Sequence, residues 1–422
     1  MAEVSKVKKS LIEGNFLRKI AKKILFSADT ALGYRYRRRY TKKIPTKNNQ
    51  VFFYTFQGDF TCNPKYISQE LERRGADVKI VWGLTNPRSL PGAKRNSKNV
   101  ALKLNTLEYF QEALASKVIV TNSTCGHKRY LIPLKKDQVL IETWHGSLGI
   151  KRFGKKSYKS SKDFPKAMVK TAKMTDYCIS NSSFEDDVYR DTFWPKGAKI
   201  LRYGHARNDI FFNNPELSKK IFDKIVNDFG LPKDKEIHFV MYGPTFRDDH
   251  NFDVYDLNFM NTLKALEKRF GGEWYMLLRY HPSNVKEEYL KNKIKSDRVL
   301  NVSDYPDMQE LMLIADAGIS DYSSWMFDYM LRRKPVFVYA RDYDNYKDER
   351  GFYYSLSKTP LPIAENNDQI VENIANFNEE KYVAEVEEFL KSKGCMEDGQ
   401  AAKRIVDLIL QIIEEGKNKP KK

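Results

Sequence analysis

The chain has 422 residues, of which 41% are hydrophobic and 13% aromatic, and its formal net charge is +18. This length exceeds the size at which one hydrophobic core stops growing, so we expect two domains, and the apolar content excludes a disordered chain. The four cysteines show neither C-x-x-C spacing nor the density of a secreted scaffold, which favours reduced thiols in a cytosolic protein.

The positive charge is concentrated near the N-terminus. Residues 1 to 50 contain 14 Lys and Arg against three Asp and Glu, a net of +11, which leaves about +7 for the remaining chain. Such a weak field over the body argues against nucleic acid as a partner. The sequence shows no cleavable signal peptide and no apolar stretch long enough to cross a bilayer.

Residues 1–48 have the pattern of a basic amphipathic segment, with apolar residues at helical spacing from Val4 to Leu25. Such a helix is attracted to the anionic inner leaflet of a membrane, although it could instead pack on its own domain. We expect that removing residues 1 to 45 weakens membrane recruitment and spares chemistry on a soluble acceptor. The basic residues assigned to the membrane are Lys19, Lys22, Lys23, Arg37 and Arg38.

Short apolar runs alternate with helix-like segments after this tail, which predicts two α/β domains with parallel sheets. The first series of predicted strands is 51–56, 78–82, 118–120, 139–141 and 177–180, and the second is 238–242, 274–279, 299–302, 317–320 and 335–339. The polar stretch 213–235 separates them. We therefore divide the chain into residues 1–48, 49–212, 213–395 and 396–422, the last containing a helix over 401–413 that should dock on the body.

A candidate general base follows the predicted strand 139–141. A histidine at a strand end, followed by a glycine that lets a substrate approach, suits proton transfer near neutral pH. A lone histidine at such a place is structural more often than not, so both interpretations stay open. The residues at this strand end are Thr143, Trp144, His145, Gly146, Ser147 and Lys151.

Three strand ends in the second half carry groups that bind phosphate. Arginine binds phosphate oxygens bidentately, and hydroxyls and helix N-termini complete such a shell. Asp321 and Ser323 have an alternative role as caps of the helix that follows. The candidate residues are Thr245, Arg247, Arg279, His281, Asp321, Ser323 and Ser324.

Several enzyme classes lack their signatures in this sequence. It contains no phosphate-binding loop of the Walker type, no G-x-G-x-x-G after the first strand and no H-E-x-x-H. The single histidines show no metal-ligand spacing. These absences argue against a P-loop kinase, a dehydrogenase and a zinc hydrolase, and no metal site is predicted.

Five motifs, in order and spacing, resemble the CDP-glycerol glycerophosphotransferase family over residues 50 to 395. They are T-W-H-G at 143–146, G-x-x-R-N-D at 204–209, Y-G-P-T-F-R-D at 242–248, R-Y-H-P at 279–282 and S-D-Y-S-S-W-M-F-D at 320–328. The closing segment, with Tyr339, Asp342, Tyr343 and Arg350 to Tyr353, is also similar to that family.

The resemblance implies a GT-B-like fold in which two Rossmann-like domains face a cleft. It implies transfer of glycerol phosphate, or a related alditol phosphate, from CDP-glycerol or CDP-ribitol, with release of CMP. The acceptor is a hydroxyl of a lipid-linked teichoic acid or capsule precursor, which ends in a saccharide or a polyol phosphate. By this resemblance His145 is the general base, and His281 stabilises the departing group. Trp144, Gly146, Ser147 and Lys151 then belong to the acceptor side, and the remaining candidates to the donor side. The implied location is the cytoplasmic face of the membrane.

Alternatives remain at this stage. After Gly146 the chain reads Ser147, Leu148, Gly149, Ile150, Lys151 where family members often read T-P-L-K-K, so the acceptor is open, as are glycerol versus ribitol and primase versus polymerase. No cofactor is certain, although a divalent cation could assist. One alternative function is that of a CMP-sialic-acid-type glycosyltransferase, although such enzymes usually have an acidic motif where this chain has His145. A second alternative is a non-enzymatic scaffold that binds a membrane or RNA. His145→Ala would leave the activity of such a scaffold intact.

Overall fold

The computed structural model describes residues 43–56, 58–90, 98–123, 132–152, 171–192, 197–247, 253–280 and 296–418. The predicted N-terminal amphipathic helix lies outside these ranges, so its role at the membrane stays a prediction. The same holds for six predicted site residues, which are Lys19, Lys22, Lys23, Arg37, Arg38 and His281.

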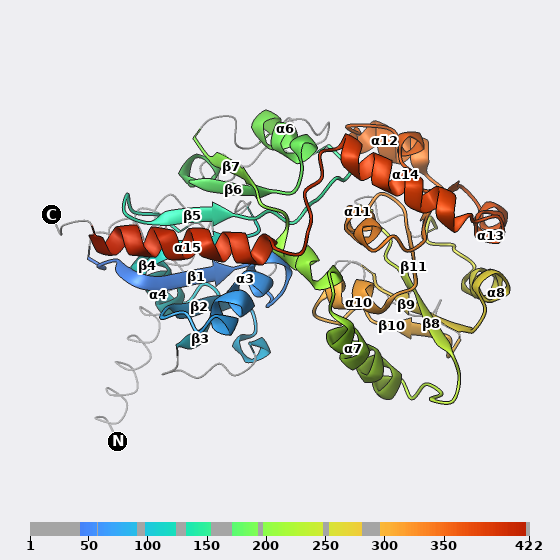
Figure 1. Cartoon of the computed structure of the whole chain (residues 1–422), viewed down its shortest axis with the longest axis horizontal. Helices are drawn as coiled ribbons and strands as arrows, with labels where there is room; N and C mark the ends of the chain where they lie inside the picture. Colours follow the sequence, from blue (N-terminus) through green and yellow to red (C-terminus); the bar gives the residue numbers. More distant parts are fainter. Residues whose placement is uncertain are drawn as a thin grey trace, which may run out of the picture.

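The first half of the molecule is built around seven parallel strands in the order β3-β2-β1-β4-β5-β6-β7 (Figure 1). Successive residues of β1 face opposite sides, because Val51 and Phe53 pack with helix α3 (Cys62–Arg73) while Phe52 packs with α4 (Leu107–Ala115). Helices on both faces explain why the central strands are apolar throughout. The strands are β1 (Lys47–Tyr54), β2 (Lys79–Leu84), β3 (Asn99–Lys103), β4 (Ser116–Thr121), β5 (Val139–Glu142), β6 (Tyr177–Ser180) and β7 (Lys199–Arg202); α6 (Ser183–Thr192) follows β6 and η1 (Pro87–Ser89) follows β2.

The second half contains a six-stranded parallel sheet in the order β10-β9-β8-β11-β12-β13. Its strands and helices share one large core, in which α7 packs against α10 and α8 against α13. The strands are β8 (Ile237–Tyr242), β9 (Glu273–Leu278), β10 (Val299–Asn301), β11 (Ala317–Ser320), β12 (Val336–Tyr339) and β13 (Ile363–Ala364). The helices are α7 (Pro215–Asp228), α8 (Phe259–Phe270), α10 (Met308–Ile314), α11 (Trp325–Tyr329), η5 (Met330–Arg332), α12 (Tyr343–Arg350), η6 (Leu356–Lys358), α13 (Asn367–Ala375) and α14 (Glu379–Ser392).

The chain passes between the halves twice. The first passage runs from β7 through η4 (Ala206–Phe211) into α7, and the second leads from α14 to α15 (Ala401–Asn418), which lies across the first sheet (Figure 1). Ile405 and Ile409 of α15 are buried against the core that α3 and β1 form. The helix predicted over 401–413 therefore packs on the first half of the molecule.

Polar contacts also join the two halves. Lys65 Nζ of α3 lies 2.6 Å from Asp307 Oδ2 and 2.6 Å from Glu310 Oε1 at the start of α10. Lys151 forms an isolated antiparallel bridge with Phe352, and the Tyr353 amide donates to the Ile150 carbonyl at 2.7 Å. These contacts hold the carboxyl ends of the two sheets toward each other.

The strand order reverses between β1 and β4 in the first sheet and between β8 and β11 in the second. Ligands of open parallel sheets bind beyond the carboxyl ends of strands near such a reversal. His145 follows β5, while Thr245 and Ser323 follow β8 and β11. The α/β class with parallel sheets is thus confirmed, and the fold places these candidates at facing sheet edges.

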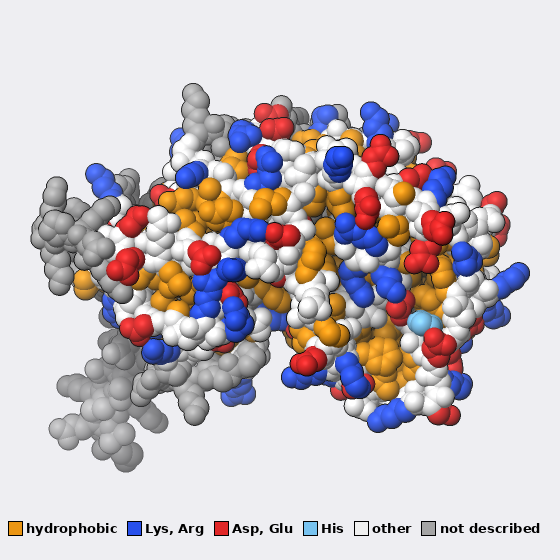
Figure 2. All heavy atoms as spheres, in the orientation of Figure 1, with side chains coloured by type: hydrophobic (Ala, Val, Ile, Leu, Met, Phe, Trp, Pro, Cys, Tyr) orange, Lys and Arg blue, Asp and Glu red, His pale blue; other side chains and the backbone are white. Residues whose placement is uncertain are grey.

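The surface gives two further observations. On the face shown in Figure 2, basic and acidic side chains are interspersed over both halves. Within the described ranges, no helix is both long enough and apolar enough to span a membrane.

Candidate functional site

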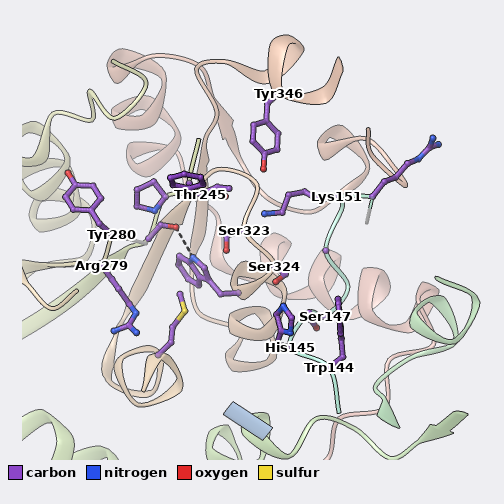
Figure 3. A pocket seen from close by; sticks show the side chains of 18 residues that line it. Trp144, His145, Ser147, Lys151, Thr245, Arg279, Tyr280, Ser323, Ser324 and Tyr346 are labelled. Carbon is purple, nitrogen blue, oxygen red and sulfur yellow. Dashed lines mark hydrogen bonds between the residues drawn. The ribbon is translucent and has the colours of Figure 1, made fainter. Parts of the chain in front are cut away.

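A cavity of about 520 Å³ lies between the carboxyl ends of the two sheets (Figure 3). Nine of the predicted site residues line it, which are Trp144, His145, Gly146, Ser147, Lys151, Thr245, Arg279, Ser323 and Ser324. Residues from both halves therefore meet around one space, as the acceptor and donor assignments require.

His145 presents one ring nitrogen for chemistry. Its Nδ1 lies 2.6 Å from the Asn122 carbonyl oxygen, which accepts only a proton-bearing nitrogen, so Nε2 carries the lone pair. The side chain is exposed to the cavity. Burial of its other sides, and to a smaller extent the charge of Arg207, lower the pKa of His145 below its ordinary value of 6.5, against the opposing effect of the Asn122 carbonyl. The imidazole is thus neutral at pH 7, the state that a general base needs.

A strained turn sets the direction of this histidine. Trp144, directly before it, has φ of +53°, a left-handed conformation that costs a bulky residue about 1–3 kcal/mol. The buried Asn63 side chain holds the turn by donating to the Thr143 and Trp144 carbonyls at 3.0 and 3.1 Å. The Trp144 amide donates to Glu142 Oε1 at 2.9 Å, and burial raises the pKa of Glu142 well above its ordinary value. Two side chains therefore stabilise a backbone shape that brings His145 into the cavity.

The opposite wall presents hydroxyl groups. Thr245 Oγ1 is buried and has no hydrogen-bond partner within the described structure, a state that costs about 1–3 kcal/mol. Ser324 stands at the N-cap of α11 without a side-chain capping bond. In Figure 3, Thr245, Ser323, Ser324 and Lys151 surround the same space. Groups that bind anionic oxygens therefore line the same cavity as His145.

Arg279 supplies a cation at the edge of this wall. Its Nη1 donates to the Val302 carbonyl at 3.2 Å and also to the Tyr305 carbonyl, which fixes the guanidinium. Burial lowers the pKa of Arg279, opposed by the charges of Asp307, Asp304 and Asp59. An arginine remains charged under such conditions.

Arg247 and Asp321 do not line the cavity, although both were predicted to bind the donor. Arg247 is buried, with its Nη2 2.8 Å from Asp321 Oδ2 and its Nε 2.7 Å from Asp342 Oδ2. The guanidinium also lies over the rings of Tyr346 and Tyr322, at 4.8 and 5.1 Å from their centroids. Asp321 Oδ1 accepts from the Thr245 amide at 2.8 Å rather than capping α11. Arg247 and Asp321 therefore stabilise the loop that carries Thr245 without lining the cavity.

A buried polar cluster beneath the His145 loop carries residues to which the sequence analysis assigned no role. Arg207 of η4 contacts Asp328 Oδ2 of α11 through Nε at 3.0 Å and Nη2 at 2.9 Å, and Nη2 also donates to the Gly146 carbonyl. Asn208 Nδ2 donates to Asp328 Oδ1 at 3.0 Å and to Glu397 Oε1 at 2.9 Å. Arg207 and Asp328 lie inside two of the five motifs, and this position was the signal in the sequence that could have identified them as functional residues.

This cluster also reaches the cavity wall. Asn181 Nδ2 donates both to Ser147 Oγ at 3.0 Å and to Glu397 Oε1 at 3.1 Å. Burial raises the pKa of Glu397 to about 7, against the lowering effect of His205. Within the described ranges, no group of three or more His, Cys, Asp or Glu side chains is placed to hold a metal ion.

Comparison with known proteins gives consistent matches. The family model for CDP-glycerol:poly(glycerophosphate) glycerophosphotransferase matches residues 35–411. The teichoic acid glycerol-phosphate transferase of Staphylococcus aureus is 29% identical over 384 residues, covering 87% of this chain and 94% of the relative. The teichoic acid poly(glycerol phosphate) polymerase of Staphylococcus epidermidis is 28% identical over 389 residues, covering 89% of this chain but only 52% of the relative.

A solved structure shows the same fold. A histidine-to-asparagine variant of the wall teichoic acid polymerase TagF, studied with CDPG, superposes with a TM-score of 0.77 at 28% identity, covering 98% of both chains. The two-sheet architecture is therefore shared over nearly the whole length. The present chain spans about half of the Staphylococcus epidermidis relative and nearly all of the Staphylococcus aureus one.

Proposed function

Because the chain belongs to the CDP-glycerol:poly(glycerophosphate) glycerophosphotransferase family, we propose that it transfers glycerol phosphate from CDP-glycerol to a hydroxyl of a teichoic acid precursor and releases CMP. One observation carries the proposal. A neutral histidine with a free Nε2 lies across one cavity from the unpartnered hydroxyl of Thr245 and an arginine. This arrangement separates a proton acceptor from an anion-binding wall, as phosphoryl transfer to an alcohol requires.

His145 is the general base in this proposal. The acceptor hydroxyl gives its proton to Nε2 as its oxygen attacks the β-phosphorus of the donor. A new P–O bond forms to the acceptor, the bond from the β-phosphorus to the bridging oxygen breaks, and CMP leaves with the negative charge. The Asn122 carbonyl stabilises the imidazolium that forms, because it accepts the proton on Nδ1.

The donor diphosphate is held by the opposite wall. Arg279 offsets its charge, while the hydroxyls of Thr245, Ser323 and Ser324 donate to its oxygens. Arg247 and Asp321 act indirectly here, by holding the Thr245 loop. His281 and a divalent cation remain predicted contributors.

CMP release with defined donors tests this function. The purified protein is mixed with a lipid-linked acceptor and with CDP-glycerol, CDP-ribitol or CMP-sialic acid, and the size of the product is measured. We expect turnover with a CDP-alditol, which also decides between glycerol and ribitol and between one transfer and many. Turnover with the sialyl donor alone would contradict the proposal.

Thr245→Val is expected to weaken donor binding without destabilising the fold. Valine has the shape of threonine but removes the unpartnered hydroxyl, so the free energy of unfolding should stay equal or rise. The affinity for CDP-glycerol should fall about tenfold with the loss of a hydrogen bond to a charged group. Calorimetric titration and urea denaturation measure the two effects.

Thr262→Val is the matched control for this change. Its buried hydroxyl donates to the Asn258 carbonyl at 2.9 Å, away from the cavity. The control should lose stability and keep its donor affinity. An equal loss of stability in both variants, with unchanged donor binding, would show that Thr245 is only structural.

The cytoplasmic membrane face is the proposed location. The basic segment 1–48 supports it, since its positive charge attracts an anionic inner leaflet. Co-sedimentation with anionic vesicles, with and without residues 1 to 45, measures this contribution; equal binding by both proteins would refute it.

A further inference from the structure

Ser147 lies in a loop whose backbone is fixed on both sides. The Gly146 carbonyl accepts from Arg207 Nη2, and the Leu148 carbonyl accepts from the Tyr354 hydroxyl. The Ser147 side chain lines the cavity (Figure 3). Because the backbone around it is held, the direction of the Ser147 O–H bond depends on the partner that its oxygen finds.

That partner is the buried amide of Asn181, the residue after β6. Asn181 Nδ2 donates to Ser147 Oγ at 3.0 Å and to Glu397 Oε1 at 3.1 Å. The Asn181 backbone is fixed as well, since its amide donates to Glu185 Oε2 at 2.8 Å and its carbonyl accepts from the Met396 amide at 2.7 Å. Asn181 therefore joins the cavity loop to the second passage between the halves, where Glu397 lies.

Glu397 determines which end of the Asn181 amide faces Ser147. The nitrogen and the oxygen of an amide exchange places by a half-turn of the group, so a neighbour must fix them. Glu397 Oε1 also accepts from Asn208 Nδ2 at 2.9 Å and from the His205 amide at 3.2 Å. An oxygen that receives these donors remains an acceptor, so the amide atom facing it must be the nitrogen. The second hydrogen of that nitrogen then goes to Ser147 Oγ.

The Ser147 hydroxyl consequently keeps its own proton for another acceptor. It cannot donate to Asn181 Nδ2, which is itself a donor, and Asn181 Oδ1 is buried without a partner. Among the residues that the structure describes, no other group accepts from this hydroxyl. Since the side chain lines the cavity, the O–H bond is available to a ligand there.

The same loop lies close to the start of α11. A side chain at Gly149 would approach Ser324 Cβ to 3.0 Å, and glycine avoids this contact. In the proposed function, Ser324 donates to an oxygen of the donor diphosphate. A phosphate bound by Ser324 therefore lies next to the loop that carries Ser147.

We propose that Ser147 donates a hydrogen bond to a non-bridging oxygen of the transferred phosphate, and that Asn181 and Glu397 are positioning residues that hold this donor in place. The inference rests on the proposed function. A hydrogen bond donated to the attacking oxygen would weaken the nucleophile, whereas a non-bridging oxygen carries negative charge that a preorganised donor stabilises. The proton stays on Ser147, and the bonds that form and break are those of the proposed transfer.

A double-variant comparison tests whether Asn181 acts through Ser147. Ser147→Ala and Asn181→Ala should each lower kcat/KM for CDP-glycerol about tenfold, the effect of one hydrogen bond to a charged group. The double variant should lose no more than Ser147→Ala alone, because both changes remove the same contact. A loss of about 100-fold in the double variant would overturn the inference, since Asn181 would then act independently of Ser147.

Two further pairs separate polarity from shape. Asn181→Leu keeps the volume of asparagine without its N–H groups and should lose as much kcat/KM as Asn181→Ala. A normal value would show that Asn181 only fills space. Glu397→Gln retains an accepting oxygen and should stay within about twofold of the wild type, whereas Glu397→Met should lose about tenfold. Equal kcat/KM in these two variants would overturn the positioning role of Glu397.

Asn373→Ala is the matched control for the loss of an asparagine contact. Its Nδ2 donates to the Ile363 carbonyl at 2.9 Å, away from the cavity. The control should keep kcat/KM within about twofold of the wild type. A tenfold fall in this variant would show that any such loss lowers activity, which would overturn the specific role of Asn181.

Binding of vanadate separates this inference from the proposed function. Vanadate takes the five-coordinate shape of phosphorus during transfer, and its binding needs no turnover. Its affinity for the intact protein, measured by calorimetric titration, should fall about tenfold in Ser147→Ala and in Asn181→Ala, and no further in the double variant. If this pattern appears while no CDP-alditol is turned over, the function fails and the positioning stands. If a CDP-alditol is turned over and the losses multiply in both measurements, the positioning fails and the function stands.

Discussion

His145→Ala should lower kcat at least about 100-fold while the protein remains folded. The side chain contributes proton transfer through Nε2, and its removal leaves the Asn63 contacts that hold the turn unaltered. The loss should appear in CMP release at saturating donor and acceptor. Binding of CDP-glycerol should change little, because the donor is held by the opposite wall.

His238→Ala provides the control, since that imidazole contacts Asp316 away from the cavity, at 3.2 Å. Its kcat should stay within about twofold of the wild-type value. Normal turnover by His145→Ala would show that another group is the base.

The pH dependence of the wild-type enzyme reports on the same residue. Because the pKa of His145 lies below 6.5, lowering the pH should reduce kcat/KM only below that value, as protonation of Nε2 removes the lone pair. An acidic limb at or above 6.5 would contradict the assignment.

Arg207→Met should reduce the free energy of unfolding by about 3–5 kcal/mol. Asp328 would remain as an unpaired buried charge, and such loss of one partner is costly. The variant also removes a positive charge that lowers the pKa of His145, so the acidic limb of kcat/KM should move to higher pH. Urea denaturation and the pH profile measure the two effects.

Arg190→Met is the control for this change. Its exposed pair with Asp187, at 3.2 Å, should contribute less than about 1 kcal/mol. If Arg207→Met does not fold, Arg207→Lys takes its place, because lysine keeps the positive charge. Its acidic limb of kcat/KM should stay at the low pH of the wild type, and its loss of stability should be smaller. If Arg207→Met folds and its acidic limb of kcat/KM lies at the wild-type pH, Arg207 has only a structural role.

The sequence predicted those features that depend on local pattern. Alternating strands and helices identified both sheets, and strand ends identified His145, Thr245 and Ser323, because parallel strands bring their carboxyl ends to one edge. The apolar stripe on 401–413 predicted that the last helix would dock, but could not say on which half. The run Val51 to Phe56 was predicted as one strand, whereas β1 ends at Tyr54 and Phe56 turns outward.

The remaining features depend on pairings that are distant in sequence. Arg207 and Asp328 are 121 positions apart, and nothing local in either indicates the other. Arg247 and Thr245 follow the same strand, yet one lies behind the loop and the other lines the cavity. Arg247 lies behind the loop because the carboxylate of Asp342, 95 positions away in the sequence, binds its guanidinium.

The return of α15 to the first sheet has a consequence for the synthesis of the protein. Residues of β1 and α3 leave the ribosome early, but the helix that completes their core lies at Ala401–Asn418 and emerges more than 300 residues later. During translation the first half therefore exposes an apolar surface until α15 has been made. We infer that a nascent chain stopped before α15 would need chaperone protection, and that completion of the first half waits for this helix.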